Sequence, residues 1–78
     1  MTLSEAISKR ILSLCEERNI TINKFSTIAG ITQSTIDHIV KKDRKDPRSL
    51  TLLRVARGFD MTLSEFFSDK IFDNLDDD

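Results

Sequence analysis

The sequence predicts an all-α domain of five short helices, and two observations carry that prediction. Apolar residues recur at spacings of three and four along most of the chain, whereas the strict alternation typical of strands is absent. Residues with side-chain oxygens stand before several of these apolar runs, where they can accept hydrogen bonds from the first backbone amides of a helix. With 78 residues, the chain is long enough for one small domain and has little room for an enclosed active site.

The first helix is expected to begin after Thr2, because Thr2 and Glu5 have the spacing of a capping box. Asn19 is expected to end it. The apolar face predicted for this helix consists of Leu3, Ala6, Ile7, Ile11, Leu14 and Cys15.

The second and third helices are short and follow each other closely. Thr21 is expected to cap a helix over 22–29, and Gly30 then stands where a left-handed residue can end it without a Cβ penalty. The inward residues of this helix are predicted to be Phe25, Ile28 and Ala29. Thr32 is expected to cap a third helix over about 33–41. The buried face predicted for this third helix is Ile36, Ile39 and Val40.

A charged loop over 42–48 precedes the last two helices. Ser49 is expected to cap the fourth helix, and Asp60 stands at its predicted end. The core residues predicted for the fourth helix are Leu50, Leu53, Val55 and Ala56. Thr62 and Glu65 form a second capping box, which opens a fifth helix. The apolar residues of that helix are Leu63, Phe66 and Phe67.

Charge is divided unevenly along the chain. Residues 1–62 hold 11 Lys and Arg against 7 Asp and Glu, a net +4, whereas residues 63–78 carry a net −5. The body is therefore basic, although the whole chain has a formal net charge of −1. A basic body favours a polyanionic partner, and phosphates would repel the acidic end.

The tight turn over 29–32 is expected to leave the third helix protruding, with one face buried and the other free to enter a DNA groove. The outward positions predicted to contact bases are Gln33, Ser34, Asp37 and His38. Gln can bond the N6 and N7 edge of adenine through two hydrogen bonds, and Ser can bond either kind of base. Basic residues placed to pair with phosphates beside the groove follow directly: Lys41, Lys42, Arg44, Lys45 and Arg48.

Four segments stand in a specific order and spacing: L-C-E-E-R-N-I-T (14–21), F-S-T-I-A-G-I-T-Q-S-T-I (25–36), D-P-R-S-L-T-L-L-R-V-A (46–56) and M-T-L-S-E-F-F (61–67). From Ile11 to Phe67 the chain thereby resembles the Cro/C1 (XRE) family of helix-turn-helix transcriptional regulators, which includes the lambda repressor DNA-binding domain and phage Cro proteins. The resemblance implies a five-helix lambda-repressor-like fold, with the second helix across the DNA backbone and the third in the major groove. It also implies base contacts from Gln33, Ser34 and His38. It implies phosphate contacts at the start of the second helix, which are predicted from Thr21, Asn23 and Lys24. Thr35 is also predicted to contact a phosphate.

Three positions depart from the pattern of that family. Many relatives have Gln at the first position of the second helix, where it supports the first Gln of the third helix; Ile22 stands there in this chain. Relatives often bury an Arg of the first helix against a Glu of the third. The matching positions are Cys15 and Val40, so both charges are replaced together and neither is stranded. A Gly that is common after the third helix is replaced by Lys42.

The sequence therefore predicts a sequence-specific transcription regulator that binds double-stranded DNA, acting as a repressor. Its DNA-binding domain is expected over 1–67, with the motif at about 22–41, followed by an acidic C-terminal extension over 68–78. A homodimer is expected, because one helix reads too few base pairs to single out a site. The dimer seam is placed at residues for which so small a chain is expected to have little core left: Phe66, Ile71, Phe72 and Leu75.

Other functions are weighed against this prediction. The aromatic stripe near the C-terminus leaves open a helical protein-interaction module or antitoxin-like partner protein, which binding to random duplex DNA would distinguish. An enzyme is not expected, since the sequence offers no enclosed carboxylate pair and no glycine-rich phosphate loop. No cofactor, metal or small-molecule site is expected, because His38 has no second ligand at suitable spacing and Cys15 lies on an apolar face. The single cysteine and the lack of a long apolar run favour a cytoplasmic protein that does not enter a membrane.

Overall fold

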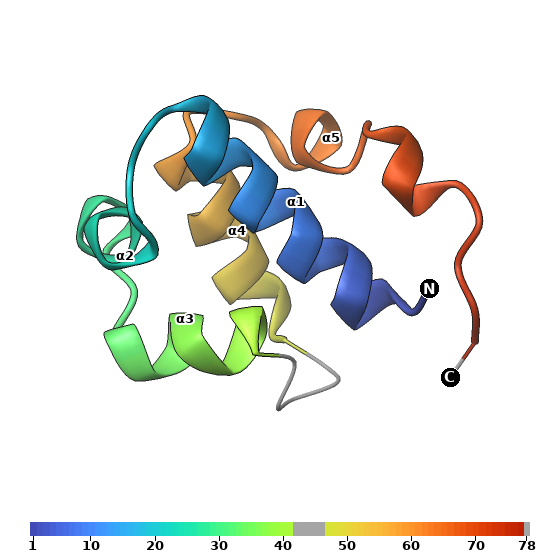
Figure 1. Ribbon diagram of the computed structural model, residues 1–78, viewed down its shortest axis with the longest axis horizontal. Helices are drawn as coiled ribbons and strands as arrows, with labels where there is room; N and C mark the ends of the chain where they lie inside the picture. The colour runs from blue at the N-terminus through green and yellow to red at the C-terminus, as the bar shows by residue number, and fades with distance from the viewer. Residues whose placement is uncertain (42–46, 78) are drawn as a thin grey trace.

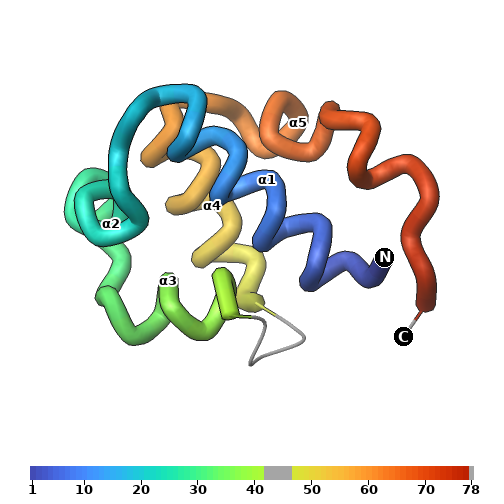
Figure 2. Tube along the Cα trace, in the orientation of Figure 1, coloured from blue at the N-terminus to red at the C-terminus, as the bar shows by residue number. Residues whose placement is uncertain are grey.

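The computed structural model describes residues 1–41 and 47–77, and it places helices around a single core (Figure 1). The elements are α1 (Leu3–Glu17), α2 (Ile22–Ala29), α3 (Gln33–Val40), α4 (Ser49–Gly58), α5 (Leu63–Phe66) and the 3-10 turn η1 (Lys70–Phe72). α1 and α4 run through the middle of the molecule, with α2 towards one end and the two termini together at the other (Figure 2). The five-helix, all-α architecture predicted from the sequence is confirmed.

Threonine side chains cap the N-termini of four helices, as the sequence predicts. The hydroxyl oxygens of these threonines accept hydrogen bonds of 3.0–3.2 Å from the backbone amide three residues further on. The capping residues are Thr2, Thr21, Thr32 and Thr62. In α1 and α5 the glutamate at that third position accepts in return from the threonine backbone amide, so both predicted capping boxes are formed. Each such cap contributes on the order of 1 kcal/mol and fixes where its helix begins.

Three helices are followed by residues in the left-handed backbone conformation. Gly30, after α2, has a φ of 69°, while Asn19 and Asp60, after α1 and α4, have φ of 57° and 59°. Gly adopts this conformation without a Cβ penalty, and Asn and Asp tolerate it better than most residues do. The helix ends predicted at these three positions are confirmed.

Two fully buried phenylalanines form the centre of the core beneath α2. The rings of Phe25 from α2 and Phe59 from the end of α4 stack with their centroids 4.0 Å apart. The apolar face predicted for the fourth helix ends at Ala56 and leaves Phe59 out of the core. In the structure that face continues at a spacing of three and four through Leu52, Val55, Ala56 and Phe59.

Three large apolar residues that were predicted to face the core are exposed instead. Leu3, Ile28 and Leu50 keep 44%, 51% and 57% of their surface exposed. In α2 the inward face is centred on Phe25 and Ser26, which are both buried, and this turns Ile28 towards solvent. Leu50 lies in the first turn of α4, off the row of residues that reaches the core. These three predictions were wrong because each helix buries a narrower face than its apolar residues suggest, and Leu3, like Leu50, lies in the first turn of its helix.

The start of α4 also differs from the prediction. Ser49 was expected to be the N-cap, but it is the first helical residue. Arg48 occupies the N-cap position, and its side chain makes no capping hydrogen bond. The third helix ends at Val40 with Lys41 as its C-cap, within one residue of the predicted end.

The C-terminal segment does not continue as an α-helix. The chain makes one 3-10 turn after α5, and the Phe72 ring packs against the rings of Phe67 and Phe66 at centroid distances of 4.8 and 6.1 Å. Phe66 is fully buried, so the expectation that it lacks a core to pack against was wrong. Further on, the backbone amide of Asp76 donates to the Met1 carbonyl at 2.9 Å, and its carboxylate lies 3.1 Å from the N-terminal ammonium. The segment therefore folds back beside the start of α1.

Arg10 of α1 fastens this segment to the core. Its Nε and Nη2 atoms donate to the carbonyl oxygens of Phe66 and Glu65 at 2.9 and 3.1 Å, and Nη1 donates to the Asp69 carboxylate at 3.2 Å. The guanidinium carbon lies 5.7 Å from the centre of the Phe66 ring, close enough for a cation–π contact. The carbonyls at the end of a helix lack partners within the helix, and Arg10 supplies them. Only 11% of the Arg10 side chain is exposed, so its hydrogen-bonding capacity is largely used inside the protein.

Candidate nucleic-acid interface

The turn between α2 and α3 leaves the first turn of α3 at the surface (Figure 1). Ile36 and Ile39 on the inner face of α3 are buried in the core, which fixes the direction of the helix. On the outer face, Gln33 and Ser34 are exposed. A helix anchored in the core therefore presents two polar side chains next to a tight turn, in the arrangement that the sequence predicts for base contact.

Gln33 is held by two side chains, although Ile22 cannot provide the support that the corresponding Gln gives in many relatives. The Gln33 Nε2 donates to the Asp37 carboxylate at 2.8 Å, and Gln33 Oε1 accepts from the Ser26 hydroxyl at 3.2 Å. Ser26 belongs to α2 and is 5% exposed, so Gln33 of α3 is hydrogen-bonded to a buried side chain of the preceding helix. The carboxamide is thus held from both sides while its side chain remains exposed.

The two other predicted base contacts lie further along α3. Asp37 and His38 are half-buried, and His38 falls in the last turn of the helix. Asp37 follows Gln33 by one helical turn, and its carboxylate accepts from the Gln33 amide. His38 near the C-terminal end of α3 is well placed to interact with the helix dipole, which favours positive charge there.

The N-terminus of α2 offers a second exposed surface. Thr21, Asn23 and Lys24 are all exposed there, and the Thr21 hydroxyl caps the Lys24 amide at 3.0 Å. Free backbone amides and the helix dipole make the start of such a helix favourable for a phosphate group. Thr35 is half-buried, and its hydroxyl accepts from the Thr32 hydroxyl at 2.9 Å.

The predicted basic cluster is only partly within the described residues. Lys41 at the end of α3 and Arg48 before α4 are both exposed. Lys42, Arg44 and Lys45 lie outside the described residues. The described part of the cluster therefore flanks α3 with two exposed positive charges.

Contacts between α1 and the end of α3 hold α3 in place. The buried Ser8 hydroxyl donates to the Val40 carbonyl at 2.7 Å, which satisfies a carbonyl in the last turn of α3.

Cys15 is buried in the same core, and Val40 packs against that core. Burial raises the pKa of the Cys15 thiol above its ordinary value, and the positive charge of Arg18 opposes that effect. Both positions are therefore part of the apolar core or packed against it.

Ser26 is the residue of this interface that the sequence does not predict. The inward face predicted for the second helix consists of apolar residues and includes Ile28, whereas the buried residues of α2 are Phe25 and Ser26. The available signal is a small hydroxyl residue one position after the buried Phe25, on the side of α2 that faces the turn.

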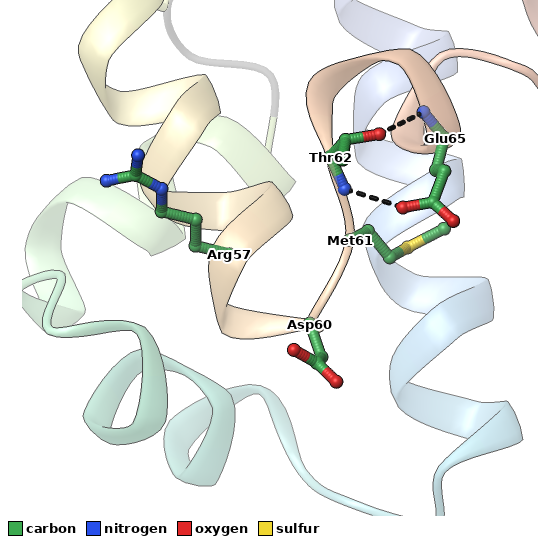
Figure 3. Close-up of a pocket in the computed structure, with 5 residues that line it drawn as sticks. All are labelled: Arg57, Asp60, Met61, Thr62 and Glu65. Carbon is green, nitrogen blue, oxygen red and sulfur yellow. Dashed lines mark hydrogen bonds between the residues drawn. The ribbon is translucent and has the colours of Figure 1, made fainter.

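A shallow pocket lies at the connection between α4 and α5, on the side of the molecule opposite α3 (Figure 3). Its lining residues are Arg57, Asp60, Met61, Thr62 and Glu65. The reciprocal hydrogen bonds between Thr62 and Glu65 form one wall and belong to the α5 capping box.

Among the described residues, no group of three or more His, Cys, Asp or Glu side chains is arranged to hold a metal ion. The helices of the described residues are each too short or too polar to span a membrane.

Comparison with known proteins agrees with this geometry. Residues 11–66 match the sequence model of the helix-turn-helix family. The chain belongs to this helix-turn-helix family. The crystal structure of the prophage Lp1 protein 11 is similar, with a TM-score of 0.82 and 27% identity over 96% of this chain and 99% of that chain. No curated protein matches the sequence.

Family membership and the structural match confirm the resemblance to Cro/C1-type regulators that the sequence motifs indicate. This protein is therefore a DNA-binding transcription regulator. Its α2 and α3 form the helix-turn-helix, with α3 in the place of the recognition helix.

Proposed function

We propose that this regulator is a repressor that recognises a specific double-stranded DNA sequence by inserting α3 into the major groove as a homodimer. The observation that carries the proposal is the exposed first turn of α3, where Gln33 and Ser34 stand on a helix fixed by the core. Side chains with amide or hydroxyl groups match the donors and acceptors of base edges in the major groove.

Base reading is tested with Gln33→Ala after bound sites have been selected from random duplexes. The variant is expected to lose about 1–3 kcal/mol of specific affinity and the preference at one base pair, with nonspecific binding almost unchanged. Fluorescence anisotropy on selected and scrambled duplexes measures both affinities. Equal losses on the two duplexes would contradict a reading role for Gln33.

The same mode of binding predicts phosphate contacts from the basic cluster. Four contacts per subunit, from Lys42, Arg44, Lys45 and Arg48, give a dimer a slope of about −7 in log affinity against log salt. Arg48→Ala is expected to reduce this slope by about 2, because it removes one contact from each subunit. Arg57→Ala serves as a charge-matched control, since Arg57 is exposed in the last turn of α4 and is not among the predicted contact residues. A wild-type slope near zero would argue against duplex DNA as the ligand.

A homodimer is proposed because one helix contacts too few base pairs to specify a single site. Two recognition helices about 34 Å apart contact two half-sites, which raises specificity far above that of one helix. Phe66 is fully buried within the protomer, so the predicted seam is reduced to the half-buried Ile71, Phe72 and Leu75. The protein-interaction module that the sequence leaves open would use the same three residues. Because Phe66 is buried, the apolar surface available to such a module is smaller than the sequence predicts.

Sedimentation with and without a two-fold DNA site tests the dimer. Truncation after Phe67 is expected to leave a folded, weaker-binding monomer, but it also removes Asp69 and Phe72, which pack within the protomer. Ile71→Ser and Leu75→Ser therefore provide milder variants. A wild-type protein that is monomeric in both conditions, with one chain per half-site, would contradict the homodimer.

Repression is tested by placing the selected site in a reporter promoter. A DNA-binding domain that covers a promoter blocks polymerase without any further activity. Expression is therefore expected to fall when the site overlaps the promoter and to stay unchanged when the site lies well upstream. Gln33→Ala is the matched control, and a rise in expression from either site would contradict repression.

A further inference from the structure

We propose that Ser26 and Asp37 are positioning residues that hold the Gln33 carboxamide in one orientation and thereby make it select adenine over guanine. This inference rests on the proposed function, since it concerns the base that Gln33 reads. It gives Asp37 a different role from the direct base contact predicted from the sequence.

The orientation of the carboxamide is decided at Asp37. A carboxylate accepts hydrogen bonds and has none to donate, so the Gln33 nitrogen must face Asp37, as it does at 2.8 Å. The reversed amide would bring Gln33 Oε1 against the carboxylate and create repulsion. The bond to a carboxylate is also stronger than one between neutral groups.

Ser26 contacts the other side of the same amide. Its hydroxyl lies 2.8 Å from the Asn23 carbonyl and 3.2 Å from Gln33 Oε1, so its single hydrogen is shared between two acceptors. The Ser26 side chain is buried, which restricts its movement. Gln33 is thereby anchored to α2 as well as to α3, and the lack of a glutamine at Ile22 is compensated.

The hydrogen bonds left unused by Gln33 determine which base fits. A carboxamide has two N–H donors and an oxygen with two acceptor sites. Asp37 takes one donor and Ser26 takes one acceptor site, which leaves one of each. Adenine presents one acceptor, N7, and one donor, the N6 amino group, in the major groove. Guanine presents two acceptors there, N7 and O6, and only one N–H remains to meet them.

The contact between Gln33 and Asp37 also has a purely structural interpretation. Residues four apart on a helix often bond, and such a bond stabilises the helix slightly. A structural role alone would affect thermal stability and leave base preference unchanged. Base preference at one position is therefore the measurement that separates the two interpretations.

The experiment uses the full chain and the site selected from random duplexes. The base pair read by Gln33 is the pair at which Gln33→Ala loses its preference. Wild-type protein is expected to bind the adenine duplex about tenfold or more tightly than the guanine duplex at that pair. Asp37→Asn is expected to reduce this ratio to about threefold or less, because an amide at residue 37 can pair with either orientation of Gln33. Ser26→Ala, which suits a helix, is expected to reduce the ratio less.

Two controls accompany these variants. Asp60→Asn makes the same change of charge at an exposed residue on the side opposite α3, and it is expected to leave the ratio unchanged. In a Gln33→Ala background, Asp37→Asn is expected to have no further effect on the ratio. Circular dichroism confirms that each variant is folded before its binding is compared.

The outcomes separate this inference from the proposed function. An unchanged adenine-to-guanine ratio in Asp37→Asn, with selective binding by the wild type, would overturn the inference alone. A guanine preference at the Gln33 pair would do the same. If the wild type binds all duplexes equally or binds none, the proposed function fails, and the inference fails with it. A reduced ratio confined to the Gln33 pair would support both.

Discussion

Each end of the molecule has a cluster of phenylalanine rings and one polar side chain with several hydrogen bonds. The two polar side chains differ in how exposed they are. At the helix-turn-helix end, the rings of Phe25 and Phe59 stack in the core, and the Gln33 amide is exposed at the surface. At the C-terminal end, the cluster around Phe66 lies beneath Arg10. Both polar groups make more than one hydrogen bond, but only Gln33 is exposed with donors and acceptors left over.

This difference separates a group that stabilises the fold from one that is available for binding. Arg10 is almost enclosed, and its donors meet the carbonyls at the end of α5. Its removal takes the charged donor from the Phe66 carbonyl and the ion pair from Asp69, which costs folding free energy. Gln33 is exposed, so the loss of its hydrogen bonds costs little folding free energy, because water can replace them. We therefore expect substitutions at the two ends to separate stability from base recognition.

The largest effect is expected from Phe59→Ala, which removes a fully buried ring from the stack under the helix-turn-helix. Such a truncation costs about 3–5 kcal/mol of unfolding free energy. Phe72→Ala is the comparison at the other end, and its half-buried ring is expected to cost less than about 2 kcal/mol. Urea denaturation measures both values. Equal losses would show that the two aromatic clusters contribute alike and would contradict the comparison.

Arg10→Ala is expected to cost about 2–3 kcal/mol, because it leaves the Glu65 and Phe66 carbonyls without their charged donor. Arg10→Lys should restore less than half of this loss, since a single ammonium cannot match the planar set of donors. Asp69→Asn removes the ion pair alone and is expected to cost under about 1 kcal/mol. Thermal and urea unfolding provide the measurements. Full stability in Arg10→Lys would mean that charge matters there and geometry does not.

Gly58→Ala probes the contact between α4 and α2. An added Cβ would lie 2.7 Å from the Ala29 Cβ and 2.9 Å from Phe25 Cε1, so the helices must move apart. Overpacking costs about 1–3 kcal/mol and outweighs the gain of about 1 kcal/mol from better helix propensity. A net loss of up to about 2 kcal/mol is expected in urea denaturation. Adding Ala29→Gly should lessen the clash, and a more stable single variant would refute the close contact.

The smallest effect on stability is expected from Gln33→Ala. An exposed substitution of this kind changes the unfolding free energy by no more than about 0.5 kcal/mol. The same variant is the one expected to lose base preference, so stability and recognition would separate within one residue. Urea denaturation beside the duplex titrations makes this comparison. A loss of more than about 1 kcal/mol would show that Gln33 is a structural residue.

The sequence by itself determined where most helices begin and end. Thr2, Thr21 and Thr32 cap helices through hydrogen bonds to amides three residues away, and Gly30 adopts the left-handed conformation that ends α2. These contacts are made within a few residues of the chain, so residue type and spacing suffice to predict them. The helix-turn-helix and the exposure of Gln33 follow from the same local rules.

Only the tertiary structure decided which side chains meet across the fold. The burial of Phe59 against Phe25, the exposure of Ile28 and the contact between Ser26 and Gln33 depend on how α2 lies against α3 and α4. Arg10 reaches its partners in α5 across more than fifty positions of sequence. Periodicity gives the faces of each helix but not their directions relative to one another. Those directions come from packing the whole core at once, and they determine which polar groups are enclosed and which remain free to bind DNA.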